Sequence, residues 1–328
     1  MTLLTGIFLL TLVVITAIAI VQTKNLFVAV MLSGVFSLLM AANFLILDSP
    51  DVALTEAAVG AGISTVLFLA ALSLTAEHER DFKPSRIAGL VVLVTIGVVI
   101  YATFDQPRLG DPMAAPQQHV APWYLANTPP LIDVPNVVTA VLASFRGYDT
   151  LGEVFVVLTA GIGVLFLLSG RPSKTAKAPP PPFHGPVEGL RHYLIPRVVG
   201  RLLIPFIFLF GLYVQFHGDF GPGGGFQAGA IIAASVILYA LLEGEPQALR
   251  VIPMRFLKIL AVGGAVLYAT VGVFGMLLGG NFLDYNVLSG DPVAGQHLGI
   301  LLVEIGVGVT VTGVLLSVFF AFATRGKM

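Results

Sequence analysis

Long apolar stretches separated by short polar connections run through most of the chain. A bilayer core about 30 Å thick requires about 20 apolar residues in one helix, and several stretches meet or approach that length. We place them at residues 3–21, 26–47, 52–74, 87–104, 151–168, 202–216, 225–242, 256–278 and 298–322. The pattern therefore predicts an all-α integral membrane protein with about nine transmembrane helices.

The basic residues fall on alternate connections between the predicted spans. Of the 17 Lys and Arg residues, only Arg108 and Arg146 lie on the same side as the N-terminus. Cytoplasmic connections carry the excess of Lys and Arg in membrane proteins, so we expect the N-terminus outside and the C-terminus in the cytoplasm. No basic residue precedes Lys24. A secretory signal peptide begins with a basic segment, which is missing here, so we interpret the first stretch as a retained helix.

Two connections are rich in proline. Residues 104–135 carry seven prolines, and because proline removes a backbone donor we expect no regular helix there. Trp123 and Tyr124 in this loop are expected to rest at the headgroup level. Apolar residues at helical spacing over 137–148 predict a short amphipathic helix leading into the fifth span. In the second connection, 169–193, four consecutive prolines at 179–182 predict an extended spacer between five helices and four.

Composition narrows the class of protein further. Charged residues make up 11% of the chain and hydrophobic residues 56%, against about 25% charged in an average soluble domain, so a soluble enzyme is excluded. The net charge of −1 offers no basic surface for nucleic acid. The chain has no cysteine, which excludes disulfides, iron–sulfur clusters and thiolate zinc sites. We find no nucleotide or redox motif, and expect no cofactor.

Three carboxylates lie inside the predicted spans: Glu56, Glu153 and Glu304. No Lys or Arg is placed at comparable depth. Because a charged side chain inside a membrane is costly, such a residue is a candidate for function. We expect these groups to meet polar groups, water, a cation or a proton.

Glu56 lies more than one turn inside the third span, which begins at Pro50 and Asp51. Gly60 and Ser64 follow at i+4 and i+8 on the same face, and small residues would let a second helix or water approach the carboxylate. We interpret Glu56 as a proton or cation relay. A structural hydrogen bond to a neighbouring helix is the alternative.

Arg146, Asp149 and Glu153 share one helix face at i, i+3 and i+7. We expect Arg146 and Asp149 to pair near the interface, which leaves Glu153 deeper in the span. The group is either an entrance for cations or protons or a structural salt bridge.

Glu304 has His297 two turns before it and Gly308 one turn after it. A histidine titrates near neutral pH and could pass protons to the carboxylate, or it is simply solvated at the membrane surface. His217 and Asp219 open a glycine-rich segment between the sixth and seventh spans. They form either an outer ion site or a polar turn cap.

Three motifs resemble parts of one family of membrane complexes. Residues 50–60 (PDVALTEAAVG) resemble the MbhD-type domain, and residues 146–153 (RGYDTLGE) resemble the MbhE-type domain, itself similar to the NuoJ subunit of respiratory complex I. Residues 217–229 (HGDFGPGGGFQAG) resemble the MnhB (MrpB) subunit. All three occur in Mrp-type multisubunit Na+/H+ antiporters and in related membrane-bound hydrogenases.

The resemblance implies a non-enzymatic subunit of a cation/proton antiporter in the cytoplasmic (inner) membrane of a prokaryote. It implies large A and D subunits and small C, E, F and G subunits as partners, with Na+ and H+ as the transported ions. It divides the chain into an MbhD-like module of three helices (1–85), an MbhE-like module of two (86–170), a linker (171–193) and an MnhB-like module of four (194–328). A redox-driven complex and a scaffold without a transport role remain alternatives.

The resemblance also ranks the site residues. Glu56 is implied as the main relay carboxylate, with transient Na+ there, and Glu153 and Asp149 follow. Pro205 and Phe226 match the MnhB pattern and would shape the path. Gly60, Asp51, His217 and Asp219 are further candidates, and Glu304 has weaker motif support.

Overall fold

The structure is a computed structural model that describes residues 2–75, 77–79, 85–108, 110–169 and 193–325. Within these residues, nine helical segments are long and apolar enough to cross a membrane, which confirms the predicted all-α membrane fold. They are α1 (Thr2–Gln22), α2 (Leu26–Ile46), a composite third span over 50–72, α5 (Arg86–Thr103), α8 (Gly147–Ser169), α9 (Leu194–His217), α10 (Gly225–Glu243), α12 (Met254–Leu277) and α13 (Pro292–Arg325).

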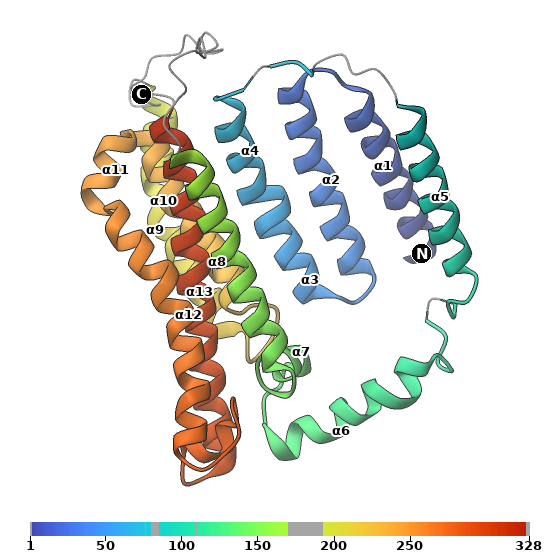
Figure 1. The fold of residues 1–328 in the computed structure, drawn as a ribbon, viewed down its shortest axis with the longest axis vertical. Coiled ribbons are helices and arrows are strands. Elements are labelled where there is room, and N and C mark those ends of the chain that lie inside the picture. The colour runs from blue at the N-terminus through green and yellow to red at the C-terminus, as the bar shows by residue number, and fades with distance from the viewer. Residues whose placement is uncertain (1, 76, 80–84, 109, 170–192, 326–328) are drawn as a thin grey trace.

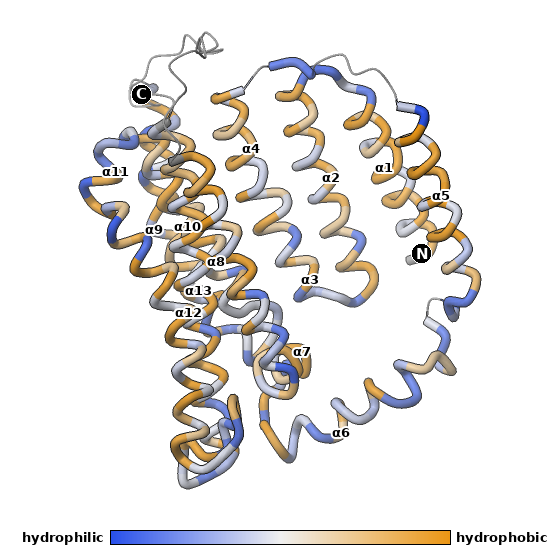
Figure 2. Tube along the Cα trace, in the orientation of Figure 1, coloured by the Kyte–Doolittle hydropathy of each residue, from blue (hydrophilic) through white to orange (hydrophobic). Residues whose placement is uncertain are grey.

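The helices run alternately up and down. The connection at 22–26, the end of the third span at residue 72, the short helix α11 (Glu245–Val251) and the end of α13 lie at one end of the molecule (Figure 1). The 47–49 turn and the 279–291 segment, which holds the 3₁₀ helix η5 (Tyr285–Leu288), lie at the other. Apolar residues follow the spanning helices and polar ones gather at their ends (Figure 2). Successive spans therefore run in opposite directions, as the expected orientation of the termini requires.

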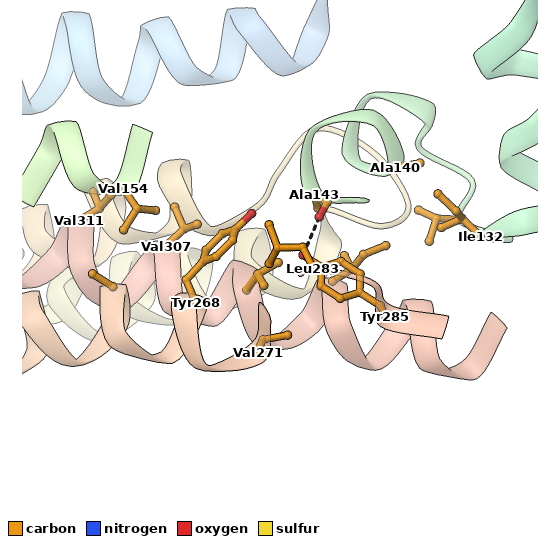
Figure 3. Close-up of a cluster of buried hydrophobic side chains, with 14 residues drawn as sticks. Ile132, Ala140, Ala143, Val154, Tyr268, Val271, Leu283, Tyr285, Val307 and Val311 are labelled. Atoms are coloured by element: carbon orange, nitrogen blue, oxygen red, sulfur yellow. Dashed lines mark hydrogen bonds between the residues drawn. The ribbon is translucent and has the colours of Figure 1, made fainter. Parts of the chain in front are cut away.

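The four C-terminal spans and α8 form a bundle around α13. This helix packs against α12, α10 and α8, and most of its residues are buried. One buried cluster joins α12, α13, η5 and the segment before α8, with the fully buried Tyr268 and Tyr285 among its members (Figure 3). The bundle fixes the positions of every element that carries a carboxylate in the cavity described below, apart from the third span.

The N-terminal spans stand in a row beside this bundle (Figure 1). Helix α2 packs between α1 and the third span, and the third span contacts α10 and α13 of the bundle. It consists of α3 (Pro50–Thr55), a π-helical stretch η1 (Glu56–Ser64) and α4 (Thr65–Leu72). π-Helical turns are rare and are frequent at functional sites. This one begins at Glu56.

The expectation that residues 104–135 lack regular helix is wrong. A π-helical turn η2 (Pro116–Val120) leads into α6 (Ala121–Leu131), which runs across the end of the molecule (Figure 1). Pro122 occupies the first turn, where a missing N–H costs nothing. Pro129 and Pro130 lie at the last turn, so only the final bonds of the helix are lost. The ring of Trp123 makes an edge contact with that of Tyr124 at 5.2 Å between centroids, and their headgroup location stays a prediction.

The short helix expected over 137–148 is present in two pieces, and its apolar residues are only partly buried. It comprises α7 (Val137–Thr139) and the π-helical η3 (Ala140–Phe145), and it ends at Arg146. Its small residues, including Ala140 and Ala143, face the core, whereas Val138 and Leu142 are exposed. The small side chains allow close approach to the bundle, whereas Val138 and Leu142 line the cavity described below and Phe145 packs against the buried cluster. The predicted linker at 171–193 lies outside the described residues, except for Tyr193 at the start of α9.

Candidate functional site

A cavity of about 610 Å³ lies where the third span meets the bundle. Its walls come from α3, the 138–143 segment, α8, the start of α10 and α13. Most lining side chains are apolar or small, but three carboxylates from different parts of the chain line it: Asp51, Glu153 and Glu304. No Lys, Arg or His is among the described residues that line it. The cavity therefore gathers acidic groups without a basic side chain in its described walls.

Glu304 lies under the glycine-rich turn between α9 and α10. A β-carbon at position 218 would lie 3.1 Å from its Oε1 atom, and one at position 224 would lie 3.2 Å away. Gly224 also has a φ of 114°, which side chains rarely allow. A β-carbon at Gly225 would collide with the carbonyl of Glu304 itself. The glycines therefore let α10 approach α13 closely enough to hold this carboxylate at the cavity wall.

Glu153 enters the cavity from α8, just after a break in the helix. The predicted pair of Arg146 and Asp149 is confirmed, with 2.5 Å between Nη2 and Oδ2, and it is solvent-exposed. Asp149 does not line the cavity, whereas Glu153 does. The pair thus marks the N-terminal end of α8, with Glu153 one turn further along the helix.

Two buried tyrosines of the bundle fix this break. The hydroxyl of Tyr268 donates to the carbonyl of Gly147 at 2.8 Å. That of Tyr285 donates to the carbonyl of Ala143 at 3.0 Å (Figure 3). Both side chains are fully buried, and burial raises the pKa of Tyr285, which keeps it a neutral donor. They position the start of α8, and with it Glu153, against α12 and α13.

Asn136 connects three distant segments beside the cavity, through its contact with the lining residue Asp51. Its Nδ2 lies 3.1 Å from Oδ1 of Asp51, 3.1 Å from the carbonyl of Gly218 and 3.0 Å from that of Gly221. Its Oδ1 accepts from the backbone N–H of Val138 and so caps α7. This residue is absent from the candidates that the sequence suggested. An asparagine after Pro135 and directly before an apolar run is the N-cap signal that points to it.

A second polar contact joins the third span to the bundle. Nε2 of Gln227 donates to Oγ1 of Thr55 at 2.7 Å, and Thr55 donates in turn to the carbonyl of Asp51. Both side chains line the cavity. The sequence does not identify Thr55 and Gln227 as candidates, because a hydroxyl and an amide near the ends of two different spans form no recognisable motif.

Glu56, the carboxylate with the strongest motif support, is separate from the cavity lining. A β-carbon at Gly60 would collide with Oε1 of Glu56 and would lie 2.7 Å from Oγ of Ser37 on α2. Gly60 therefore makes room for the carboxylate at the α2 interface. Ser64 donates to the carbonyl of Gly60 at 2.5 Å. The glycine and the serine lie on the predicted face, but the carboxylate faces α2.

The remaining candidates divide between the cavity and other surfaces. Phe226 lines the cavity, whereas Pro205 lies inside α9 with an exposed side chain and does not. The ring of His217 stacks on that of Tyr213 at 4.9 Å, away from the cavity lining. These positions give Pro205 and His217 no direct contact with the gathered carboxylates.

Asp219 lies at the turn next to Asn136, whose backbone N–H donates to its carbonyl at 2.9 Å. Its Oδ1 is buried and has no hydrogen-bond partner among the described residues. Burial raises the pKa of Asp219, and the charge of His297 partly offsets this. Within the described part of the chain, no cluster of His, Asp and Glu side chains has the arrangement of a metal site.

Comparison with known protein families divides the chain into three matched regions. Residues 195–317 match a domain described as related to the MnhB subunit of the Na+/H+ antiporter. Residues 11–77 match the MbhD family, described as the D-type subunit of MBH, and residues 86–181 match the MbhE family, its E-type subunit. The resemblance inferred from the three motifs is therefore confirmed.

Individual relatives agree with this division. A putative antiporter subunit mnhB2 of Staphylococcus aureus is 33% identical over 130 residues, which are 39% of this chain and 92% of that protein. A probable K(+)/H(+) antiporter A/B subunit of Rhizobium meliloti is 25% identical over 90% of this chain and 32% of its own length. The chain spans only 60%, 32% and 20% of the first three curated relatives that it matches.

Two solved structures are similar to this chain over most of its length. A chain of the Mrp complex of a Dietzia species matches with a TM-score of 0.76 and 27% identity, covering 96% of this chain and 34% of the other. A chain of the membrane-bound sulfane sulfur reductase, an archaeal respiratory membrane complex, matches with a TM-score of 0.50 and 28% identity. That match covers 71% of this chain and 97% of the other.

Proposed function

We propose that this chain, which belongs to the MnhB family of antiporter subunits, contributes carboxylates to an ion or proton path in a cation/proton antiporter complex. Membership of this family supports a role as a membrane subunit of such an antiporter. The finer assignment, exchange of Na+ for H+ in the cytoplasmic membrane of a prokaryote, is our proposal. We also propose that the chain assembles with large A and D subunits and small C, E, F and G subunits. Its N-terminus would lie outside and its C-terminus in the cytoplasm.

One observation carries the proposal: a single cavity gathers Asp51, Glu153 and Glu304 from three different family-matched regions. A carboxylate that has mostly apolar walls and no basic side chain beside it is costly as a free anion. It is stabilised when it binds a proton or a cation. Several such groups in one cavity therefore form a site where a proton and a monovalent cation compete for the same oxygens, which is the physical basis of exchange.

The other candidates take places around this site. Glu56 at the α2 interface would hold a proton or transient Na+ on the far side of the third span. Asp149 and Asp219 lie near the end that we propose to face outside, where they would form the entrance for cations. The modules at 1–85, 86–170 and 194–328 would act as one unit, because the cavity requires residues from all three.

The test replaces each carboxylate by its neutral isostere in the assembled complex. We expect Glu304→Gln and Glu153→Gln to lower Na+-dependent proton exchange in membrane vesicles by about 100-fold, the order expected for a lost proton-transfer group, while the complex still assembles. Asp105→Asn removes an exposed carboxylate after α5 and serves as the control with wild-type exchange. Wild-type exchange in both Glu304→Gln and Glu153→Gln would overturn the proposal, and loss of assembly alone would favour a scaffold.

A second candidate is a subunit of a redox-driven membrane complex. The match to the archaeal respiratory complex covers nearly all of that chain. The present chain has no cysteine, so the redox centres would belong to partners. Iron–sulfur absorbance in the purified complex supports this candidate, and exchange without such absorbance supports the antiporter.

A further inference from the structure

Gln227 on α10 is an amide whose two ends are distinguished by their hydrogen bonds. The residue is 9% exposed and lines the cavity. Its Nε2 donates to Oγ1 of Thr55 at 2.7 Å. The hydroxyl of Thr55 has a single proton, which it donates to the carbonyl of Asp51 at 2.9 Å, so Oγ1 can only accept from the amide. The nitrogen end of the amide is therefore fixed on the side of the third span.

The carbonyl end of Gln227 lies beside Glu304. A β-carbon at Gly224 would lie 3.2 Å from Oε1 of Glu304 and 3.6 Å from Oε1 of Gln227. Apart from Gly224 and its two neighbours in the chain, no heavy atom of the described residues is closer than 3.2 Å to that point. All three residues line the cavity. One oxygen from α10 and one from α13 therefore border the same opening in the cavity wall.

This pair of oxygens has the chemistry of a metal-cation site. Carboxylate and amide carbonyl oxygens are ligands for hard metal cations. A carboxylate also takes up a proton, whereas an amide oxygen only accepts hydrogen bonds or a cation near neutral pH. The amide therefore adds affinity for a metal cation without adding affinity for a proton.

The charges at the opening also favour a cation. Gly224 is the N-cap of α10, and the positive end of a helix is equivalent to about half an elementary charge. The full negative charge of the Glu304 carboxylate exceeds it. No Lys, Arg or His is among the described residues that line the cavity. One carboxylate charge at this opening therefore balances one monovalent cation.

We propose that the carboxylate of Glu304 and the amide carbonyl of Gln227 bind one monovalent metal cation at the cavity wall, and that Gln227 sets the preference of this site for the metal cation over a proton. Thr55 is a positioning residue, because its hydrogen bond orients the amide. The part of this site in exchange rests on the function proposed above. The binding of the ion rests on the two oxygens alone.

The first test separates the Na+ concentration for half-maximal exchange, KM, from the maximal rate in vesicles that contain the assembled complex. We expect Gln227→Met, which keeps the length of the side chain but has no oxygen, to raise KM for Na+ by about ten-fold, the lower end of the loss when a metal site is deprived of a supporting group. Gln227→Glu keeps an oxygen in the same place and should not raise KM. An unchanged KM in Gln227→Met overturns the proposal.

Two further variants separate a ligand from a packing role. Thr55→Val removes the hydrogen bond that orients the amide but keeps both oxygens, so KM should rise by less than in Gln227→Met. Gln296→Met removes another buried amide, which contacts Ser144 and Asn286 away from the cavity lining. It is the matched control, with wild-type KM. An equal rise of KM in Gln296→Met shows a general effect of losing a buried amide and overturns the assignment of Gln227 as a ligand.

Binding of radiolabelled Na+ to the purified complex tests the shared site without transport. We expect Glu304→Gln and Gln227→Met to weaken the same binding event. Because groups that hold one ion are not independent, the double variant should lose no more bound Na+ than Glu304→Gln alone. Losses that add in the double variant indicate two separate sites and overturn the proposal.

The outcomes keep the two proposals apart. Wild-type KM in Gln227→Met, alongside loss of exchange in Glu304→Gln, overturns the cation site and leaves the proposed function intact. Wild-type exchange in both Glu304→Gln and Glu153→Gln overturns the proposed function. A shared loss of bound Na+ in Glu304→Gln and Gln227→Met then still supports the cation site, because binding is measured without exchange.

Discussion

Asn136→Ala is expected to loosen the junction between the third span, α7 and the glycine-rich turn. The change removes a side chain that is 9% exposed and whose Nδ2 lies within 3.1 Å of three acceptors, on Asp51, Gly218 and Gly221. An amide has two N–H groups, so two good bonds at a time are the most it can supply. The substitution also removes the N-cap of α7.

These contacts set the size of the effect. Two net hydrogen bonds contribute about 0.5–1.5 kcal/mol each. A lost Asn cap costs about 0.5–2 kcal/mol. The contributions are not strictly additive because one side chain makes them all, so we expect Asn136→Ala to lower the free energy of unfolding by about 2–4 kcal/mol.

Thermal denaturation of the purified protein measures this change, with Asn127→Ala as the matched control. The Nδ2 of Asn127 donates to the carbonyl of Trp123 at 2.8 Å on an exposed face of α6, so its loss should change stability by at most about 0.5 kcal/mol.

Asn136→Asp gives the sharper comparison. It keeps the capping oxygen but replaces the donor with a carboxylate that faces Asp51 and two carbonyls, so it should be at least as destabilising as Asn136→Ala. A stability of Asn136→Asp equal to wild type would refute the assignment of the amide as the donor that joins these segments.

Two further changes test the tyrosine contacts and the turn. Tyr268→Phe removes the hydrogen bond to the Gly147 carbonyl and should lower the free energy of unfolding by about 1 kcal/mol, the usual size for a buried hydrogen bond in a membrane protein. Thermal denaturation measures this change, with Tyr101→Phe at an exposed position as the control. Equal melting temperatures of the two variants would contradict the prediction. Asp219→Asn should stabilise the protein more at pH 7 than at pH 4. Burial raises the pKa of Asp219, so the folded state binds more protons and wild-type stability falls as pH rises through that pKa; melting curves at both pH values measure the difference, and a larger gain at pH 4 would show the sign to be wrong.

The sequence predicts the structure correctly where one local property of the chain decides it. The spans follow from runs of apolar residues, because a helix in lipid must satisfy its own backbone and expose apolar side chains. The Arg146–Asp149 pair follows from spacing on a single helix. In contrast, the number of prolines in 104–135 does not predict α6, because the effect of a proline depends on its position in the helix. Pro122 lies in the first turn of α6 and Pro129 and Pro130 in its last, where they disrupt little.

The sequence by itself determined the membrane fold, the alternation of the helices and the family. It also selected Glu56, Glu153 and Glu304 as unusual, because each lies within an apolar run. Those properties are local, so one stretch of residues is enough to specify them.

Only the tertiary structure decided which carboxylates share a site. Motif strength favoured Glu56, yet Glu304 lies with Glu153 and Asp51 in the cavity, while Glu56 faces α2. The difference arises from contacts between segments far apart in the chain: glycines at 218 and 224 admit the Glu304 carboxylate, and Asn136 holds the turn beside Asp51. Close approach of helices depends on which small residues meet across the interface, and no spacing within one helix specifies its partner.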